Sequence, residues 1–256
     1  MTVLLEAHEV IHTYSTTWYE PVTRMPSRLN EAISCAYLLM RGIDEIEDHP
    51  TLPADTKAQL LRGVSAVWQE RCRPAELNAL LAPHHDVLPE VTLRLDEWSR
   101  LAPEEIAPRV QETFATMAER MATWAQADFA IRTEADLDRY TYAVAGTLVL
   151  LLSDLWTWYD GTAVDRTLGV AYGRALQAVN ILIDRDTDTA RGVDFWPDNW
   201  GTTEMSTYAR TELTRADQYL DSLRPGPART FCDQPLRNAH KAWATVPWPP
   251  HQGSAA

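Results

Sequence analysis

Amide and carboxylate side chains recur at helical spacing in the stretch 171–198, which reads AYGRALQAVNILIDRDTDTARGVDFWPD. Gln177, Asn180, Asp184 and Asp188 follow one another at steps of three, four and four residues. At about 100° per residue, these steps place the four side chains on one helix face. Buried carboxylates need a partner, and two aspartates one turn apart can share a divalent cation such as Mg²⁺. A solvated acidic helix face is the alternative interpretation.

A second stretch, residues 34–48, repeats this chemistry nearer the N-terminus. It reads SCAYLLMRGIDEIED and places Arg41, Asp44 and Asp48 at steps of three and four. If the two helices face each other across a cavity, their Asp-x-x-x-Asp pairs would hold a small cluster of Mg²⁺ ions between them. The ligand that such a cluster binds best is a diphosphate, so the repeated pattern favours a diphosphate site over a solvated face.

Three segments together resemble the squalene/phytoene synthase family of prenyl-transferring enzymes. The block with the first aspartate motif is similar to residues 15–50, STTWYEPVTRMPSRLNEAISCAYLLMRGIDEIEDHP. The central tyrosine-plus-VAG helix is similar to residues 136–156, DLDRYTYAVAGTLVLLLSDLW, and the second aspartate motif to residues 176–197, LQAVNILIDRDTDTARGVDFWP. The segments occur in family order and frame roughly residues 14–200.

The helical patterns along the chain predict an all-α fold, and the resemblance implies a single isoprenoid-synthase-type bundle of antiparallel helices around a central cavity. We expect one domain over 1–256, with its core at 14–222 and a C-terminal tail from about 246. Apolar periodicity and breaker residues predict around ten helices. They are placed at 3–13, 26–48, 55–72, 75–81, 86–101, 103–128, 134–159, 171–188, 203–222 and 228–245, with an irregular polar entry at 15–18.

Composition narrows the class of protein. The formal net charge of −13 makes nucleic acid an unfavourable partner. Three widely spaced cysteines argue against a disulfide framework and fit a reducing compartment. The acidic start MTVLLEAHEVIH does not resemble a signal peptide, and the apolar run Val144–Trp156 is too short and too polar to span a bilayer. We therefore expect a cytoplasmic protein without a transmembrane segment.

His8, Glu9 and His12 form a literal H-E-x-x-H motif, the signature of zinc metalloproteases. The motif begins at residue 8, which leaves no substrate-binding subdomain ahead of it. No pattern for a third ligand stands out elsewhere in the chain. A zinc hydrolase is therefore kept only as a minor alternative.

By the resemblance, Asp44, Asp48, Asp184 and Asp188 are the catalytic metal ligands, and Mg²⁺ neutralises charge that develops on the leaving diphosphate. Arg41 and Arg191 are assigned to the diphosphate through charge-assisted hydrogen bonds. Gln177 and Asn180 are assigned to orienting a metal-bound water or a phosphate oxygen. The pocket that shields the resulting allyl cation is assigned to four aromatic side chains: Trp18, Tyr142, Trp156 and Phe195.

Four departures from the family pattern direct the choice of reaction. Ala143 stands where the alignment expects a catalytic tyrosine, although Tyr142 is adjacent, and cations are replaced at Thr16, Ile183 and Val193. Fewer cations suggest that only one diphosphate is handled. The main interpretation is therefore a Mg²⁺-dependent prenyltransferase of secondary metabolism that moves a prenyl group, with dimethylallyl diphosphate as the expected donor, to an aromatic or quinone acceptor. The alternative is head-to-head condensation of two prenyl diphosphates, and the acceptor, chain length and oligomeric state stay open.

Overall fold

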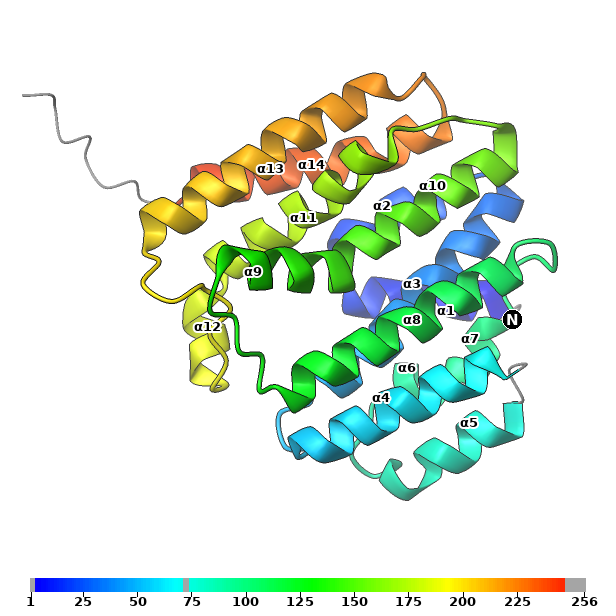
Figure 1. The fold of residues 1–256 in the computed structure, drawn as a ribbon. Coiled ribbons are helices and arrows are strands. Elements are labelled where there is room, and N and C mark those ends of the chain that lie inside the picture. Colours follow the sequence, from blue (N-terminus) through cyan, green and yellow to red (C-terminus); the bar gives the residue numbers. More distant parts are fainter. Residues whose placement is uncertain (1–2, 71–73, 247–256) are drawn as a thin grey trace, which may run out of the picture.

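The computed structural model describes residues 3–70 and 74–246. In this part of the chain there are fourteen α-helices and no strand, so the predicted all-α class is confirmed (Figure 1). The expected tail lies outside the described residues from position 247 onward. The α-helices are Val3–Tyr14 (α1), Thr16–Thr23 (α2), Ser27–Glu47 (α3), Ala54–Gln69 (α4), Pro74–Leu81 (α5), Glu90–Leu93 (α6), Leu95–Ser99 (α7), Ala107–Gln126 (α8), Glu134–Thr141 (α9), Thr147–Asp160 (α10), Arg166–Ile183 (α11), Arg185–Ala190 (α12), Thr202–Ser222 (α13) and Pro227–Ala244 (α14).

The polar segment after residue 14 is helical, and its prediction as an irregular entry was wrong. The Ser15 side chain accepts a hydrogen bond from the Trp18 backbone N–H and so caps α2. A serine at this position satisfies one of the donors that a helix start leaves without a partner. Thr133 and Asp136 form a reciprocal capping box at the start of α9.

Several predicted helices are interrupted. The predicted helix 86–101 is divided at Arg94, whose ψ of 19° is outside the helical range. The predicted helix 171–188 is interrupted at Asp184, which ends α11 and precedes α12. The Asp188 N–H still donates to the Asp184 carbonyl at 2.9 Å, so the two aspartates remain one turn apart. The interruption therefore leaves the spacing of the second aspartate motif intact.

The predicted helix 134–159 is present, but it contains a π-helical turn at Tyr142–Gly146 (η2) between α9 and α10. Such turns occur frequently at functional sites. α11 crosses this turn closely: a Cβ at Gly173 would lie only 2.6 Å from the Ala145 carbonyl oxygen. Glycine at 173 is therefore required by the approach of the two backbones. Gly146 is also closely packed, because a Cβ there would lie 3.0 Å from the Tyr142 side chain and 3.2 Å from the Val170 side chain.

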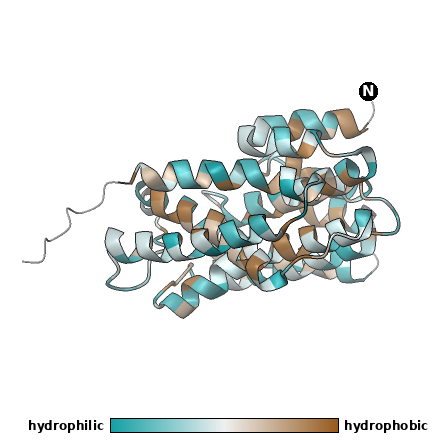
Figure 2. Cartoon of the chain, turned by 90° about the horizontal axis from the view of Figure 1, so that it is seen from above, coloured by the Kyte–Doolittle hydropathy of each residue, from teal (hydrophilic) through white to brown (hydrophobic). Residues whose placement is uncertain are grey.

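The helices surround a central space. α13 and α14 form the upper edge of the bundle in Figure 1, α4 and α5 form the lower edge, and α3, α10 and α11 lie between. α4 packs against α8, and α11 packs against both α10 and α13. Most helices carry hydrophobic and hydrophilic segments on the same element (Figure 2), as expected for amphipathic helices around a shared core. None of the described helices is long and apolar enough to cross a membrane.

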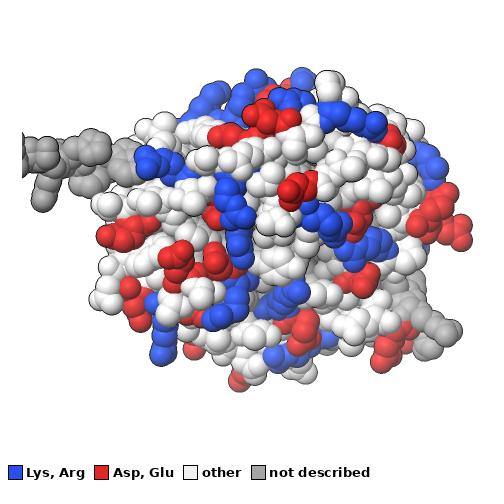
Figure 3. All heavy atoms as spheres, turned by 45° about the horizontal axis from the view of Figure 1, so that its top comes forward, with Lys and Arg blue, Asp and Glu red and all other residues white. Residues whose placement is uncertain are grey.

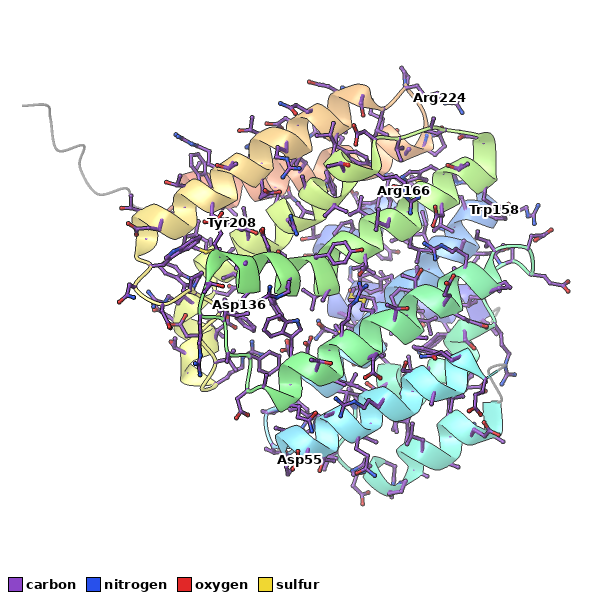
Figure 4. The ribbon with its side chains drawn as sticks, in the orientation of Figure 1. Asp55, Asp136, Trp158, Arg166, Tyr208 and Arg224 are labelled. Atoms are coloured by element: carbon purple, nitrogen blue, oxygen red, sulfur yellow. The ribbon has the colours of Figure 1, made fainter. Side chains whose placement is uncertain are left out.

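Ion pairs connect helix ends across the surface. Asp154 of α10 accepts hydrogen bonds from Arg109 of α8 at 2.6 Å and from Arg166 of α11 at 2.5 Å. Arg224, which follows α13, pairs with Asp160 at the end of α10 at 3.0 Å, and Figure 4 labels it beside the connection to α14. Acidic and basic side chains are interspersed over the face drawn in Figure 3. Exposed pairs of this kind contribute at most about 1 kcal/mol each.

Candidate active site

A cavity of about 420 Å³ lies between α3, α10 and α11, with α2, α12 and α14 also contributing to its wall. This volume is in the range of small-molecule sites, which is about 300–1,000 Å³. Asp44, Asp48, Asp184 and Asp188 all line it, so the two sequence motifs share one cavity. The carboxylates lie where α3 and α11 end. Side chains nearer the start of both helices line the rest of the wall and are mainly apolar.

Arg191 connects the two aspartate motifs. Its Nη2 donates to Asp188 Oδ1 at 2.6 Å, and its Nη1 lies 3.4 Å from Asp48 Oδ2. Arg41 lies on the other side of the first motif, where it pairs with Asp44 at 3.0 Å and with Glu45. Both guanidinium groups line the cavity. They are therefore placed to exchange a carboxylate for a phosphate oxygen when an anionic ligand enters.

The carboxylates are crowded enough to change their acidity. Burial, followed by repulsion from Asp48, raises the pKa of Asp44 to about 7. Burial also raises the pKa of Asp184 and of Asp188, and Arg191 opposes the rise in both. Charged carboxylates that are held close together in a partly buried site attract cations. This end of the cavity is accordingly suited to a ligand or ion that carries positive charge.

The donor set fits a hard divalent cation. Among the residues that the structure describes, no three His, Cys, Asp or Glu side chains converge on one point as a closed metal cage. Mg²⁺ does not require such a cage, since it is usually held by one or two carboxylates together with water and substrate phosphates. Asp44 with Asp48, and Asp184 with Asp188, would each supply such a pair. A bound ion would neutralise charge on a leaving diphosphate.

The two predicted amides also reach the cavity, because Gln177 and Asn180 of α11 both line it. They follow Gly173 and Leu176 along the same wall and precede Asp184. The helical spacing of this face is therefore preserved from the apolar part of the cavity to the carboxylates. Their assignment to a water or phosphate oxygen stays a prediction, as does the assignment of the four aspartates to metal.

Three further wall residues were missed by the sequence reasoning: Tyr37, Glu47 and Tyr140. Glu47 is 1% exposed, and its Oε1 is buried without a hydrogen-bond partner. Burial raises its pKa well above the ordinary value, and Asp48 and Asp44 add to the rise. Glu47 could have been found, because it lies three residues after Asp44 and therefore on the same helix face. The same spacing argument connects Tyr37 to Arg41.

Tyr140 extends the aromatic part of the wall. Its ring stacks on Phe195 with centroids 4.8 Å apart, and its phenol is buried. Burial, followed by repulsion from Glu47 and Asp48, raises its pKa well above the ordinary value. The phenol is therefore a neutral hydrogen-bond donor at the edge of the acidic cluster. Tyr140 belongs to the predicted tyrosine-plus-VAG helix, but the sequence prediction considered only positions 142 and 143 for the tyrosine at the site.

Two of the four predicted pocket aromatics are misplaced. Trp18 and Phe195 line the cavity, whereas Tyr142 and Trp156 are not part of its wall in the described structure. The Tyr142 ring lies under the guanidinium of Arg120, 5.0 Å from its centroid. Trp156 is 1% exposed and lies behind Phe231, with the two ring centroids 5.5 Å apart. The helical spacing shows on which helix face Tyr142 and Trp156 lie, but it does not show which residues of other helices cover them.

The zinc alternative is not supported by the structure. His8 Nε2 is 2.8 Å from Asn30 Oδ1, so one of its ring nitrogens is engaged with α3. The His12 ring contacts Tyr19 edge to face, with centroids 4.7 Å apart. Neither histidine is among the residues that line the cavity. The H-E-x-x-H pattern is thus a coincidence of helix packing, in which both imidazoles serve contacts within the N-terminal region.

Solved structures show the same fold. The complex of TcSQS with the ligand BPH1237 superimposes with a TM-score of 0.77 and 19% identity, over 94% of this chain and 78% of that chain. A dehydrosqualene synthase in complex with a ligand matches with a TM-score of 0.56 and 16% identity, over 94% and 83%. At these identities the likeness concerns the fold, and the predicted helical bundle is confirmed.

Curated relatives include the squalene synthase of Schizosaccharomyces pombe, 25% identical over 93% of this chain and 58% of its own length. The presqualene diphosphate synthase of Botryococcus braunii is 28% identical over 76% and 49%. The squalene synthase of Ganoderma lucidum is 30% identical over 75% and 43%. The chain therefore spans about half the length of the curated relatives it matches.

These relatives contradict the main functional prediction. They are named as squalene and presqualene diphosphate synthases, and none of those reported above is an aromatic prenyltransferase. The prediction of an aromatic or quinone acceptor was wrong because it rested on counting absent cations at single positions. Arg41 and Arg191, which were already assigned to the diphosphate, both line the cavity, so the replaced positions do not leave the site without positive charge.

The resemblance noted in the sequence extends well beyond the two motifs. The family description squalene/phytoene synthase matches residues 11–246, which include every helix from α2 to α14. Both aspartate pairs and all the cavity-lining residues lie within that span. The chain therefore belongs to the squalene/phytoene synthase family.

Proposed function

We propose that this protein is an enzyme that joins two prenyl diphosphates head to head. The observation that carries the proposal is the division of one cavity into two parts. Four aspartates and two arginines line one end, and the remaining wall is formed mainly by apolar and aromatic side chains. Such a cavity suits a ligand with an anionic head and a long hydrocarbon tail. The names of the relatives support the same reaction.

The acidic end would bind the diphosphates. Asp44 with Asp48 and Asp184 with Asp188 would hold divalent cations, which supply Lewis-acid stabilisation of the leaving group. Arg41 and Arg191 would donate charge-assisted hydrogen bonds to phosphate oxygens. Magnesium as the ion and the cytoplasm as the compartment remain predictions.

The apolar part would govern the fate of the hydrocarbon. When the C1–oxygen bond of one substrate breaks, the diphosphate leaves with the electron pair and an allylic cation remains. Both carbons of the second substrate's double bond then bond to C1 while C1 loses a proton, which gives a cyclopropyl diphosphate. Departure of the remaining diphosphate, followed by loss of a proton or transfer of a hydride from NADPH, would give the hydrocarbon. Leu148, Leu152 and Leu176, which line the cavity, would keep water from that region, so that the cation would not be hydrolysed to an alcohol. The ring faces of Trp18 and Phe195 can stabilise it.

The test is turnover with purified protein, Mg²⁺ and geranyl, farnesyl or geranylgeranyl diphosphate, each alone, with NADPH present or absent. We expect a cyclopropyl diphosphate or a hydrocarbon with twice the carbon number, detected by mass spectrometry. The product should be lost in Asp44→Asn and retained in the matched control Asp186→Asn, whose exposed side chain does not line the cavity. Prenyl alcohols alone, or no product from any of the three diphosphates, would refute the proposal.

A further inference from the structure

The apolar end of the cavity is closed by an aromatic residue from the last described helix. Phe231 of α14 lines the cavity and is 3% exposed. Its ring lies between two tryptophans, with centroids 5.5 Å from Trp18 of α2 and 5.5 Å from Trp156 of α10. Three helices far apart in the sequence therefore meet at this ring.

The wall formed by α10 shows where the cavity ends. Leu148 and Leu152 line it at a spacing of four residues. The next residue on that face is Trp156, since one helical turn separates each from the next. Trp156 does not line the cavity, and its ring contacts Phe231. Phe231 thus covers the position at which the cavity would otherwise continue by one more turn.

A hydrogen bond to the backbone of the next residue, Cys232, holds Phe231 in place. The Tyr172 hydroxyl donates to the Cys232 carbonyl at 2.8 Å, and both residues are buried. Tyr172 itself lines the cavity from α11. A hydrogen bond between buried groups is costly to break, because it leaves a buried carbonyl without a donor. Phe231, which forms the floor of the cavity, is therefore fixed to the same helix that carries the second aspartate motif.

The length of the cavity wall along α3 can be compared with the length of a prenyl chain. On α3 the lining runs from Asp44 back to Ile33, which is eleven residue steps and spans about 16 Å at about 1.5 Å per step. An extended isoprene unit contributes four carbon–carbon bonds to the main chain and is about 5 Å long. About three units fit between the acidic end and the floor. A fourth unit would need a longer wall than this stretch of α3 provides.

We propose that Phe231, supported by Trp18 and Trp156, sets the longest prenyl chain that the site accepts, and that this limit is a chain of three isoprene units. The inference rests on the proposed function for the identity of the ligand as a prenyl diphosphate. It adds the residue that determines chain length. Replacing Phe231 by a smaller side chain opens the cavity toward Trp156 and admits a fourth unit.

The experiment measures binding, so that it does not depend on turnover. Prenyl thiolodiphosphates of 10, 15, 20 and 25 carbons, which resist ionisation, are titrated calorimetrically into the protein with Mg²⁺. For the natural sequence we expect affinity to rise up to 15 carbons and to fall about tenfold or more at 20, the scale of discrimination by apolar contacts. In Phe231→Leu the 20-carbon ligand should bind within about threefold of the 15-carbon ligand. Phe231→Ala should extend acceptance to 25 carbons.

Phe231→Leu is the decisive variant, because the larger deletion in Phe231→Ala could prevent folding. Its matched control is Phe114→Leu, the same change at a buried position of α8 that does not line the cavity. If folded Phe231→Leu keeps the natural length profile, or if Phe114→Leu shifts the profile equally, the floor assignment is overturned. If the profile moves in Phe231→Leu alone while no head-to-head product forms, the floor stands and the proposed reaction fails.

Discussion

The two ends of the cavity are built in different ways. The acidic end uses two short sequence motifs, each an Asp-x-x-x-Asp pair with one arginine nearby, one at the end of α3 and the other at the end of α11 and in and just after α12. The aromatic end uses single residues from α2, α10 and α14, which lie up to about 200 positions apart. Local sequence spacing thus positions the charged side chains within each motif. Tertiary packing positions the aromatic residues that we propose to limit the length of the prenyl chain. Substitutions at the two ends should therefore fail in different ways.

The largest effect is expected at the acidic end. Asp44→Asn and Asp184→Asn each remove one charge from a carboxylate pair, and we expect turnover to fall by about 10³-fold or more. The preference between 15 and 20 carbons should stay unchanged, because the floor is untouched. Steady-state kinetics with each diphosphate checks both quantities. A changed length preference in either variant would show that the two ends are not separable.

A smaller effect is expected for the arginine that joins the motifs. Arg191→Gln removes the contacts to Asp188 and Asp48, and turnover should fall by about 10- to 100-fold. Diphosphate binding should also depend less strongly on the Mg²⁺ concentration. Arg191→Lys keeps the charge but loses the two-pronged geometry, so it should recover only part of the loss. Arg237→Gln, an exposed arginine of α14, is the control. Full activity in Arg191→Gln would exclude a role for the bridge.

The acidic end should also reduce the stability of the protein as pH rises. The folded pKa of Asp44, about 7, exceeds its ordinary value of 3.8, so only the folded state holds this proton between those values. The free energy of unfolding should therefore fall as pH rises from about 4 to about 7. Because Asp44 is a quarter exposed, we expect a loss of about 1–2 kcal/mol.

Thermal unfolding in EDTA at pH 5.5 and pH 8 measures this contribution. The decrease between the two values should be larger in the natural protein than in Asp44→Asn, since only the former carries the titrating group. Mg²⁺ at pH 8 should restore stability to the natural protein more than to the variant. An equal decrease in both proteins would place the pH dependence elsewhere in the chain.

The smallest effect is expected at the anchor of the aromatic end. Tyr172→Phe removes the hydrogen bond to the Cys232 carbonyl and should lower the free energy of unfolding by about 1–2 kcal/mol. Turnover with the 15-carbon diphosphate should change little, whereas discrimination against 20 carbons should weaken as α14 gains freedom. Chemical denaturation and competition between the two diphosphates measure these effects. Unchanged discrimination would mean that packing alone holds Phe231.

Prediction from sequence was most successful where the relevant distances are local. The steps between Gln177, Asn180, Asp184 and Asp188 survive the interruption of the helix, because the Asp188-to-Asp184 hydrogen bond maintains one helical turn. The all-α class followed from the same periodicity. The helix at Thr16–Thr23 was missed because a serine cap and tertiary contacts overrode a polar composition.

Tertiary contacts decided which aromatic residues face the ligand. Trp156 was assigned to the pocket from its place on α10, yet Phe231 covers it, and no spacing within α10 reports on α14. Tyr142 was assigned likewise, yet its ring lies against Arg120 of α8. Glu47 was accessible to the spacing argument but was overlooked beside the two aspartates.

The sequence by itself determined the helical class, the two carboxylate pairs and the family, since each depends on residue types at short, fixed separations along a helix. Only the tertiary structure decided that Arg191 connects both pairs, that Glu47 and Tyr140 join the wall, and that Phe231 closes it. The physical reason is that burial and contact depend on which helices pack together. That packing is a property of the whole chain, since each side chain is covered by residues distant in sequence.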